Sequence, residues 1–220
     1  MFHTFKTSLL AGLLAGLVGC SQNASMVSEP LQPLASEPAA YLVGSIGPKY
    51  LALSTAENQR LLFRKRGSQY GAAGVWMSGT YPTSEDVRDA DGTASVFVLP
   101  LKPGDYEFYD FQFYSSTYQP GLGTIVMSRQ AREKFNMPMR LEAGKAYYLG
   151  EFRSTCIQQG RCMFLWRDEM ARDGAIAKRQ HPEMPAPELL HLDMKAAASF
   201  IMDDTASKSV ESAARTGGQP

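Results

Sequence analysis

The chain has 220 residues, and its 22 lysines and arginines balance 22 aspartates and glutamates, so the formal net charge is zero. This balance argues against nucleic acid as a partner, because nucleic-acid-binding domains carry a broad basic character. One domain of ordinary size with flexible ends fits this length, and 11 Phe, 10 Tyr and 2 Trp can supply its core.

The first twenty residues are typical of a secretion signal. Lys6 gives a positive start, residues 8–18 are almost entirely Leu, Ala, Gly and Val, and Gly19-Cys20 follows as a small-residue processing site. A transmembrane helix needs about 20 apolar residues. This run is too short and no later segment is longer, so we predict no membrane span.

Leu17-Val18-Gly19-Cys20 resembles the lipobox of bacterial lipoproteins. The resemblance implies a diacylglyceryl thioether on Cys20, cleavage before it, and acylation of the new amino terminus. Two or three acyl chains anchor a protein to a bilayer stably, whereas one holds it only marginally. An ordinary signal peptide with a chance cysteine is the alternative. Ser21 stands where an aspartate would resemble an inner-membrane retention signal, which favours the outer membrane, facing the periplasm.

The remaining chain divides into three parts by composition. Residues 20–40 are rich in Ser, Pro and Ala without periodicity, and we interpret them as the lipidated N-terminus and a flexible tether. Residues 41–194 form the expected β-sandwich domain. Residues 195–220 are rich in Ala, Ser, Thr and Gly and are expected to be a disordered tail.

Short strands separated by Gly and Pro turns predict a mainly β fold, a single immunoglobulin-like sandwich. The expected strands are residues 41–46, 59–66, 94–101, 105–114, 138–141, 145–155 and 161–167. Residues 94–101 are apolar on both faces, which predicts a central strand covered on each side. Asp168 is the expected cap of one short helix that ends before Pro182, and residues 188–193 form a possible last strand.

Two of these strands contain a break in the two-residue period. Tyr106 and Phe108 fall on one face of residues 105–114, whereas Tyr109, Phe111 and Phe113 fall on the other. A bulge near Phe108, or a strand covered on both faces, would reconcile them. Gly150 inside a strand likewise predicts a close approach or a bulge.

Two segments resemble a family of bacterial lipoproteins whose β-sandwich carries a turn-plus-aromatic strand and later an Ala-Gly-Lys-aromatic strand. The matching residues are Lys102-Pro103-Gly104-Asp105-Tyr106-Glu107-Phe108 and Leu141-Glu142-Ala143-Gly144-Lys145-Ala146-Tyr147-Tyr148-Leu149-Gly150. The resemblance covers residues 41–193 and implies the fold. Because the family has no established activity, it implies no function for this chain.

Cys156 and Cys162 are the two cysteines left after lipidation of Cys20. Gln158-Gln159-Gly160 suits a three-residue hairpin loop, which places Ile157 opposite Arg161 and Cys156 opposite Cys162. In an oxidising periplasm this arrangement predicts a disulfide bond. Two buried free thiols are the alternative.

No motif in the sequence indicates catalysis, a cofactor or a metal site. His181 and His191 lack partners at ligand spacing, and residues 86–92 only hint at a calcium loop, so an ordinary loop is the favoured interpretation. Arg64-Lys65-Arg66 could contact anionic lipid or glycan. A charged edge that blocks strand addition is the favoured interpretation.

Aromatic residues are the best functional candidates. Trp76, Tyr81, Tyr109, Tyr114 and Tyr118 could line a groove that stacks on a sugar or holds a peptide, although core packing explains them equally well. We therefore expect an anchored binding or structural module of the bacterial envelope, with a protein or glycan partner. The alternative is a hydrolase with its site in the long loops at residues 68–93 and 115–132.

Overall fold

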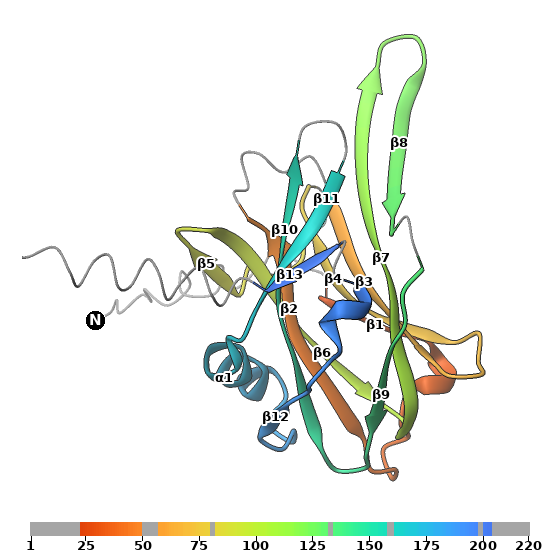
Figure 1. The fold of residues 1–220 in the computed structure, drawn as a ribbon, viewed down its shortest axis with the longest axis vertical. Helices are drawn as coiled ribbons and strands as arrows, with labels where there is room; N and C mark the ends of the chain where they lie inside the picture. The colour runs from red at the N-terminus through yellow and green to blue at the C-terminus, as the bar shows by residue number, and fades with distance from the viewer. Residues whose placement is uncertain are drawn as a thin grey trace, which may run out of the picture.

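The structure is a computed structural model that describes residues 23–49, 57–79, 82–131, 134–157, 161–197 and 200–203. Two β-sheets pack face to face, and one α-helix covers the outside of one of them (Figure 1). The predicted mainly β sandwich with one short helix is confirmed. No helix in these ranges is long and apolar enough to cross a membrane.

The first sheet has six strands. Its order is β1 (Ser25–Val27), β4 (Gly71–Met77), β3 (Asn58–Lys65), β7 (Gly104–Gln119) and β8 (Gly123–Gln130), and β9 (Met137–Leu141) pairs with the other half of β7. All these pairs are antiparallel. β7 and β8 continue well beyond the other strands as a projecting hairpin (Figure 1).

The second sheet has seven strands. Its order is β13 (Ile201–Asp203), β11 (Arg161–Arg167), β10 (Ala146–Ile157), β2 (Ala40–Pro48), β6 (Gly92–Leu101) and β5 (Val87–Asp89), and β12 (Pro187–Leu189) pairs with β10. Helix α1 (Met170–Gln180) lies against β2, β6 and β10. Two short 3₁₀ turns, η1 (Glu29–Leu31) and η3 (Met194–Ala197), complete the described elements.

Alternation along the strands builds two apolar layers. In β6, Phe97, Leu99 and Leu101 face the other sheet, and Ala94, Val96 and Val98 face α1. All six are buried, as predicted for a strand that is apolar on both faces. The neighbouring β2 divides in the same way, because Leu42 and Ile46 join the inter-sheet core while Val43 lies under the helix.

A bulge at Tyr109 adjusts β7 to the core. Leu62 pairs with Asp110 and Phe63 with Phe108, so Tyr109 is the extra residue. The bulge lets Tyr106, Phe108, Phe111 and Phe113 all enter the core. The predicted bulge is confirmed, and Tyr109 is the residue that it turns away from the core.

A second irregularity lies at Gly150, where the β10–β2 register shifts between Tyr148 and Glu151. Gly150 has φ +127°, and a Cβ there would lie 2.0 Å from Nε1 of Trp166. Gly150 therefore combines the predicted close approach, to Trp166, with the predicted bulge. The shift moves Phe152 into the inter-sheet core beside Tyr147 and Leu149.

The N-terminal segment differs from the predicted flexible tether. Ser25–Val27 pairs with β4, and Leu31 is buried. The Ser25 hydroxyl also donates to the Val98 carbonyl at 2.7 Å and accepts from the Val98 amide at 3.0 Å. A flexible tether over the whole of residues 20–40 is therefore wrong, because Ser25–Val27 and Leu31 belong to the sandwich.

Other boundaries are also corrected. The predicted loop at residues 68–93 contains β4 and β5, and the loop at 115–132 contains the end of β7 and all of β8. The predicted tail from residue 195 contains most of η3 and then β13. Glu169, not Asp168, is the N-cap of α1 and makes no side-chain cap hydrogen bond; Asp168 accepts from the Met170 amide at 3.0 Å. Of residues 188–193, only the first two are in β12.

Candidate binding surface

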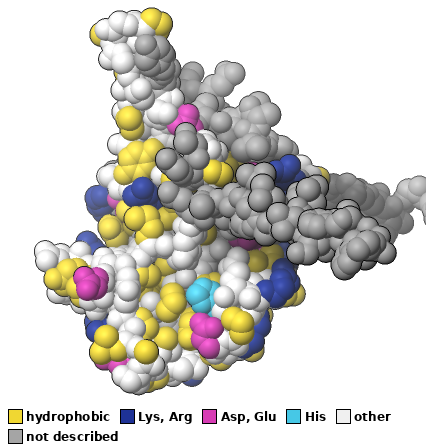
Figure 2. Space-filling view, turned by 180° about the vertical axis from the view of Figure 1, so that it is seen from behind, with side chains coloured by type: hydrophobic (Ala, Val, Ile, Leu, Met, Phe, Trp, Pro, Cys, Tyr) yellow, Lys and Arg dark blue, Asp and Glu magenta, His cyan; other side chains and the backbone are white. Residues whose placement is uncertain are grey.

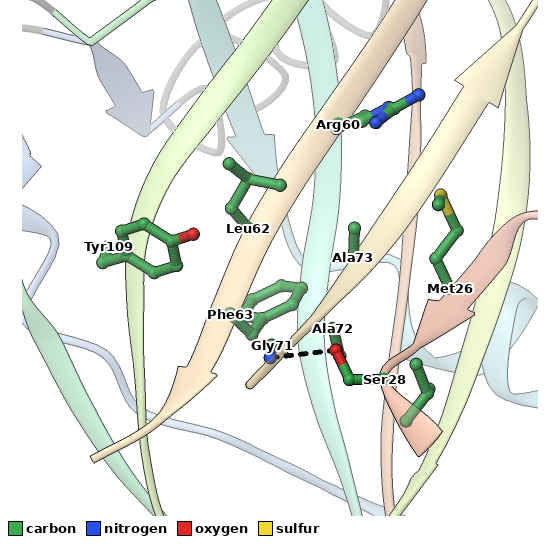
Figure 3. A pocket seen from close by; sticks show the side chains of 10 residues that line it. Met26, Ser28, Arg60, Leu62, Phe63, Gly71, Ala72, Ala73 and Tyr109 are labelled. Carbon is green, nitrogen blue, oxygen red and sulfur yellow. Dashed lines mark hydrogen bonds between the residues drawn. The ribbon is translucent and has the colours of Figure 1, made fainter. Parts of the chain in front are cut away.

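A shallow pocket of about 310 Å³ lies on the outside of the six-stranded sheet (Figure 3). It is lined by β1, β3, β4 and the bulge of β7, and it is mostly apolar. The lining residues are Met26, Val27, Ser28, Arg60, Leu62, Phe63, Gly71, Ala72, Ala73 and Tyr109. We call the outer face that carries this pocket the open face.

The alternation of β3 explains which side chains line the open face. Leu61 and Phe63 point into the core, so Arg60, Leu62 and Arg64 point outward. Ala73 of β4 stands beside Leu62, and Met26 of β1 stands beside Ala73. Small side chains on β4 leave the hollow between longer ones, and Met26 at its rim is 47% exposed.

Two arginines of β3 cover two tyrosines of β7. The Arg60 guanidinium lies 5.3 Å from the centroid of the Tyr114 ring, and that of Arg64 lies 4.5 Å from the centroid of Tyr109. Such cation–π contacts contribute about 0.5–1 kcal/mol at exposed sites. They hold the long arginine side chains along the sheet and leave polar nitrogen atoms at the pocket rim.

The two arginines differ in charge compensation. Arg64 forms an ion pair with the nearly buried carboxylate of Glu107. Arg60 donates to Asn58 Oδ1 at 3.2 Å, and no carboxylate of the described residues lies within ion-pair distance of it. Arg60 is therefore the cation of the open face that remains available to an acidic group.

Burial raises the pKa of Tyr109, although the nearby Arg64 guanidinium opposes this shift. The Tyr109 phenol therefore stays neutral and can donate a hydrogen bond at physiological pH. The open face thus offers the Tyr109 hydroxyl as a donor, the Arg60 guanidinium as a cation and an apolar hollow. That set can hold an apolar side chain next to an acidic or carbonyl group, but it contains no nucleophile with a base beside it.

Only two of the five aromatic residues predicted to line a groove are seen on the open face. Tyr109 and Tyr114 lie on the open face, half-buried. Trp76 is 2% exposed and packs in the inter-sheet core, so its predicted place on a surface is wrong. Tyr81 and the side chain of Tyr118 lie outside the part of the chain that the structure describes. Arg60, Leu62 and Met26 of the open face are absent from the sequence-based prediction. The outward phase of β3 could have identified Arg60 and Leu62 but not Met26, which lies in β1.

The predicted basic patch at residues 64–66 does not form a sheet edge. Its strand, β3, lies between β4 and β7. The interpretation of a charged edge that blocks strand addition is therefore wrong. Arg64 instead fixes Tyr109 and Glu107, and Arg66 is exposed at the end of the strand.

A second polar cluster lies between α1 and the seven-stranded sheet. Asp173 accepts hydrogen bonds from Ser45 at 2.5 Å, Tyr148 at 2.7 Å and Arg172 at 2.8 Å. Arg172 and Arg153 both donate to Glu151 Oε1 at 2.7 Å. Ser45, Glu151, Arg153 and Asp173 are fully buried. We call this set the buried network, and its burial leaves no room for a substrate.

Burial raises the pKa of Asp173, against the opposing effect of Arg172 and the Ser45 and Tyr148 hydroxyls. Burial also raises the pKa of Tyr148, and the Asp173 carboxylate adds to this shift. For Arg172, burial lowers the pKa, but the carboxylates of Asp173 and Glu151 outweigh it and raise the pKa overall. The network therefore holds a charged arginine between acidic groups and fixes α1 on the sheet.

Metal ligands are not gathered anywhere in the described ranges, where no group of three or more His, Cys, Asp or Glu side chains could hold an ion. The hint of a calcium loop at residues 86–92 also has a different explanation. Asp89 pairs with Arg153 and Asp91 with Arg167, at 2.7 and 2.6 Å, and Asp86 accepts from the Val96 amide. These three carboxylates therefore already bind groups of the seven-stranded sheet.

The backbone of the β10–β11 hairpin follows the predicted register. Cys156 pairs with Cys162 and Ile157 with Arg161. Arg129 of β8 lies 3.9 Å from Cys162 Sγ. The pairing places the two cysteines directly opposite each other, which is the backbone arrangement that the disulfide prediction requires.

Comparisons with known proteins do not assign a family. No family model matches the chain, and no curated protein matches it. A solved leucine-rich repeat protein from Bacteroides thetaiotaomicron is similar over 55% of this chain and 14% of that chain, at 10% identity and a TM-score of 0.29.

Proposed function

We propose that this protein is a lipid-anchored binding module of the bacterial envelope, in the outer membrane and facing the periplasm, and that the open face holds a protein partner. The observation that carries the proposal is the contrast of the two sheets. Helix α1 covers the seven-stranded sheet, whereas no described helix packs on the open face with its pocket, its apolar rim and Arg60.

The chemistry of the open face favours a peptide segment over a glycan. Sugars bind proteins by stacking on free aromatic faces. On the open face Arg60 and Arg64 already cover one side of Tyr114 and Tyr109. An apolar side chain can fill the hollow beside Leu62 and Ala73, and an acidic group next to it can pair with Arg60. We therefore propose an extended peptide segment that carries one apolar and one acidic residue.

Copurification from envelope extracts tests this function. Arg60→Glu reverses the available charge and Leu62→Asp places a carboxylate in the hollow, so each should remove a partner that binds the wild type. Ala175→Glu on the exposed side of α1 is the matched control and should retain the partner. A partner that survives Arg60→Glu and Leu62→Asp but is lost with Ala175→Glu would contradict the proposal.

The anchor rests on the resemblance at Cys20 and is tested separately. The mass of the mature protein should include acyl chains on Cys20, and Cys20→Ala should abolish this mass increment. A soluble wild-type protein without acyl mass would overturn the anchor. The open face would then still be tested by copurification, because that readout does not depend on lipid.

We also propose the Cys156–Cys162 disulfide, supported by the opposed register of the two residues. Chain-entropy arguments for so short a loop give about 2 kcal/mol, so the bond would fix the β10–β11 hairpin and not the whole fold. Thiol counting in denatured protein, alkylated before isolation and measured with and without reductant, decides this. Two reactive thiols before reduction would refute the bond.

A further inference from the structure

We propose that the projecting β7–β8 hairpin inserts its apolar tip into the same bilayer that holds the lipid anchor. We call residues 115–128 the arm. Beyond Tyr114, which pairs with Asn58 of β3, β7 pairs only with β8 within the described ranges. This inference rests on the proposed function, because it takes the anchored N-terminus as its reference point.

The arm lacks the features that normally protect a projecting ribbon in water. A two-stranded hairpin is only marginally stable by itself, and exposed edge strands are usually protected by charges. Residues 115–128 contain no Asp, Glu, Lys or Arg. Leu122 is 76% exposed, Val126 is 64% exposed and Ile125 is 37% exposed. Figure 2 shows hydrophobic side chains and no charged ones at the end of the arm.

The strand directions bring the N-terminus to the arm's end of the sandwich. Ser25 pairs with Gly74 and Val27 with Ala72, so the chain before Ser25 runs along β4 toward Met77. Met77 pairs with Asn58, which pairs with Tyr114 at the base of the arm. The Ala24 carbonyl, bonded to the Val75 amide at 2.7 Å, continues this course.

Chain lengths make the two membrane contacts compatible. Residues 20–23 span at most about 10 Å when extended, so acyl chains on Cys20 would hold the Met77 end of β4 within about that distance of the lipid. The base of the arm at Tyr114 lies at the same level along the strand direction. The five residues 115–119 project about 17 Å past Tyr114. The tip would thus reach a few ångströms into the bilayer, near the 5–10 Å depth typical of interfacial apolar segments.

Two properties of the arm limit how it can enter lipid: β8 is an edge strand within the described ranges, and the arm carries no charge. The unpaired backbone groups of β8 would be costly deep in hydrocarbon, so insertion is limited to the tip around Leu122, where they can still reach water or headgroups. Because the arm carries no charge, its insertion should not depend on anionic lipid or on salt.

The test uses the full protein with a fluorophore that responds to polarity, attached at Leu122→Cys. Leu34→Cys is the matched control, because Leu34 is 63% exposed and follows η1 at the opposite end of β1. Both proteins are reconstituted into vesicles of phosphatidylethanolamine and phosphatidylglycerol, with labelled wild type as background. The label at 122 should shift to the blue and be quenched by shallow spin-labelled lipid, and the label at 34 should show neither change.

A further substitution separates insertion from other contacts. Val126→Asp in the Leu122→Cys protein should abolish the blue shift. A blue shift that persists without lipid, or that lipid quencher does not affect, would mean that the arm binds a second copy or another protein and would overturn the inference. A water-exposed label at 122 in protein whose acyl mass is confirmed would overturn it and leave the anchor intact. If Cys20 carries no lipid, the same fluorescence on added vesicles still decides whether the arm inserts.

Discussion

The outer faces of the two sheets differ in whether a helix covers them. The seven-stranded sheet covers its outer face with α1, an apolar layer of Val96, Val98 and Ile176, and the buried network. The open face of the six-stranded sheet presents Arg60, Leu62 and Met26 around a pocket. The buried polar contacts therefore fix one helix on one face, whereas no described helix covers the open face.

Substitution of Arg153 should cause the largest loss of stability, because this substitution breaks the buried network under α1. Arg153 is fully buried and pairs with both Glu151 and Asp89. Breaking one partner of a buried ion pair costs about 3–5 kcal/mol. Arg153→Met should lower the free energy of unfolding by that amount, measured by urea denaturation. Arg64→Met on the open face is the control and should cost about 1 kcal/mol, because the Arg64 side chain is half-exposed.

Shortening one apolar side chain on each outer face tests the same difference between the two sheets. Ile176→Ala removes a buried side chain between α1 and the sheet and should cost about 2 kcal/mol. Leu62→Ala on the open face should cost about 1 kcal/mol or less, because Leu62 is only half-buried. Equal losses in thermal or urea unfolding would mean that the open face is packed as tightly as the covered one.

A smaller effect on stability should come from the titration of Asp173 in the buried network. The pKa of Asp173 is raised by burial, so its favourable contribution is complete below the unfolded pKa and is lost as pH rises through the folded pKa. Asp173→Asn cannot titrate. The stability of the wild type relative to Asp173→Asn should therefore decrease as pH rises from about 3.8 through the acidic range. If this relative stability instead increased with pH, the pKa of Asp173 would be lowered in the folded protein, which would contradict the prediction.

Much of the fold could be predicted because local rules agreed with the packing. The two-faced apolar pattern of residues 94–101 matches a strand buried between the other sheet and α1, and the phase break near Phe108 matches the bulge at Tyr109. The spacing of Cys156 and Cys162 gave the observed hairpin register. In each case, the pattern lay within one strand or one turn.

The failures came from pairing between distant segments. β4 reads GAAGVWM, and its small residues were interpreted as a loop, but they suit a strand where Phe97 packs against Gly74. Ser25–Val27 looked like a tether and became ordered because β4 provides its partner. Trp76 was assigned to a surface for the same reason, since a residue in a presumed loop has no predicted inward face.

The candidate site was only partly visible in the sequence. Tyr109 and Tyr114 were singled out as aromatic residues, but their partners Arg60 and Arg64 depend on the pairing of β3 with β7. The pocket depends further on Ala73 and Met26, which belong to strands that were not predicted. A binding surface that spans four strands cannot be assembled before their order is known.

Photo-crosslinking in intact cells tests the central claim, that the open face is the partner surface, most directly. A photoreactive amino acid replaces Leu62 in one protein and Ala175, on the exposed side of α1, in another. The account predicts one discrete protein adduct from position 62, its loss when Arg60→Glu is added, and no such adduct from position 175. The same adducts from both positions, or an adduct at 62 that Arg60→Glu leaves unchanged, would contradict it.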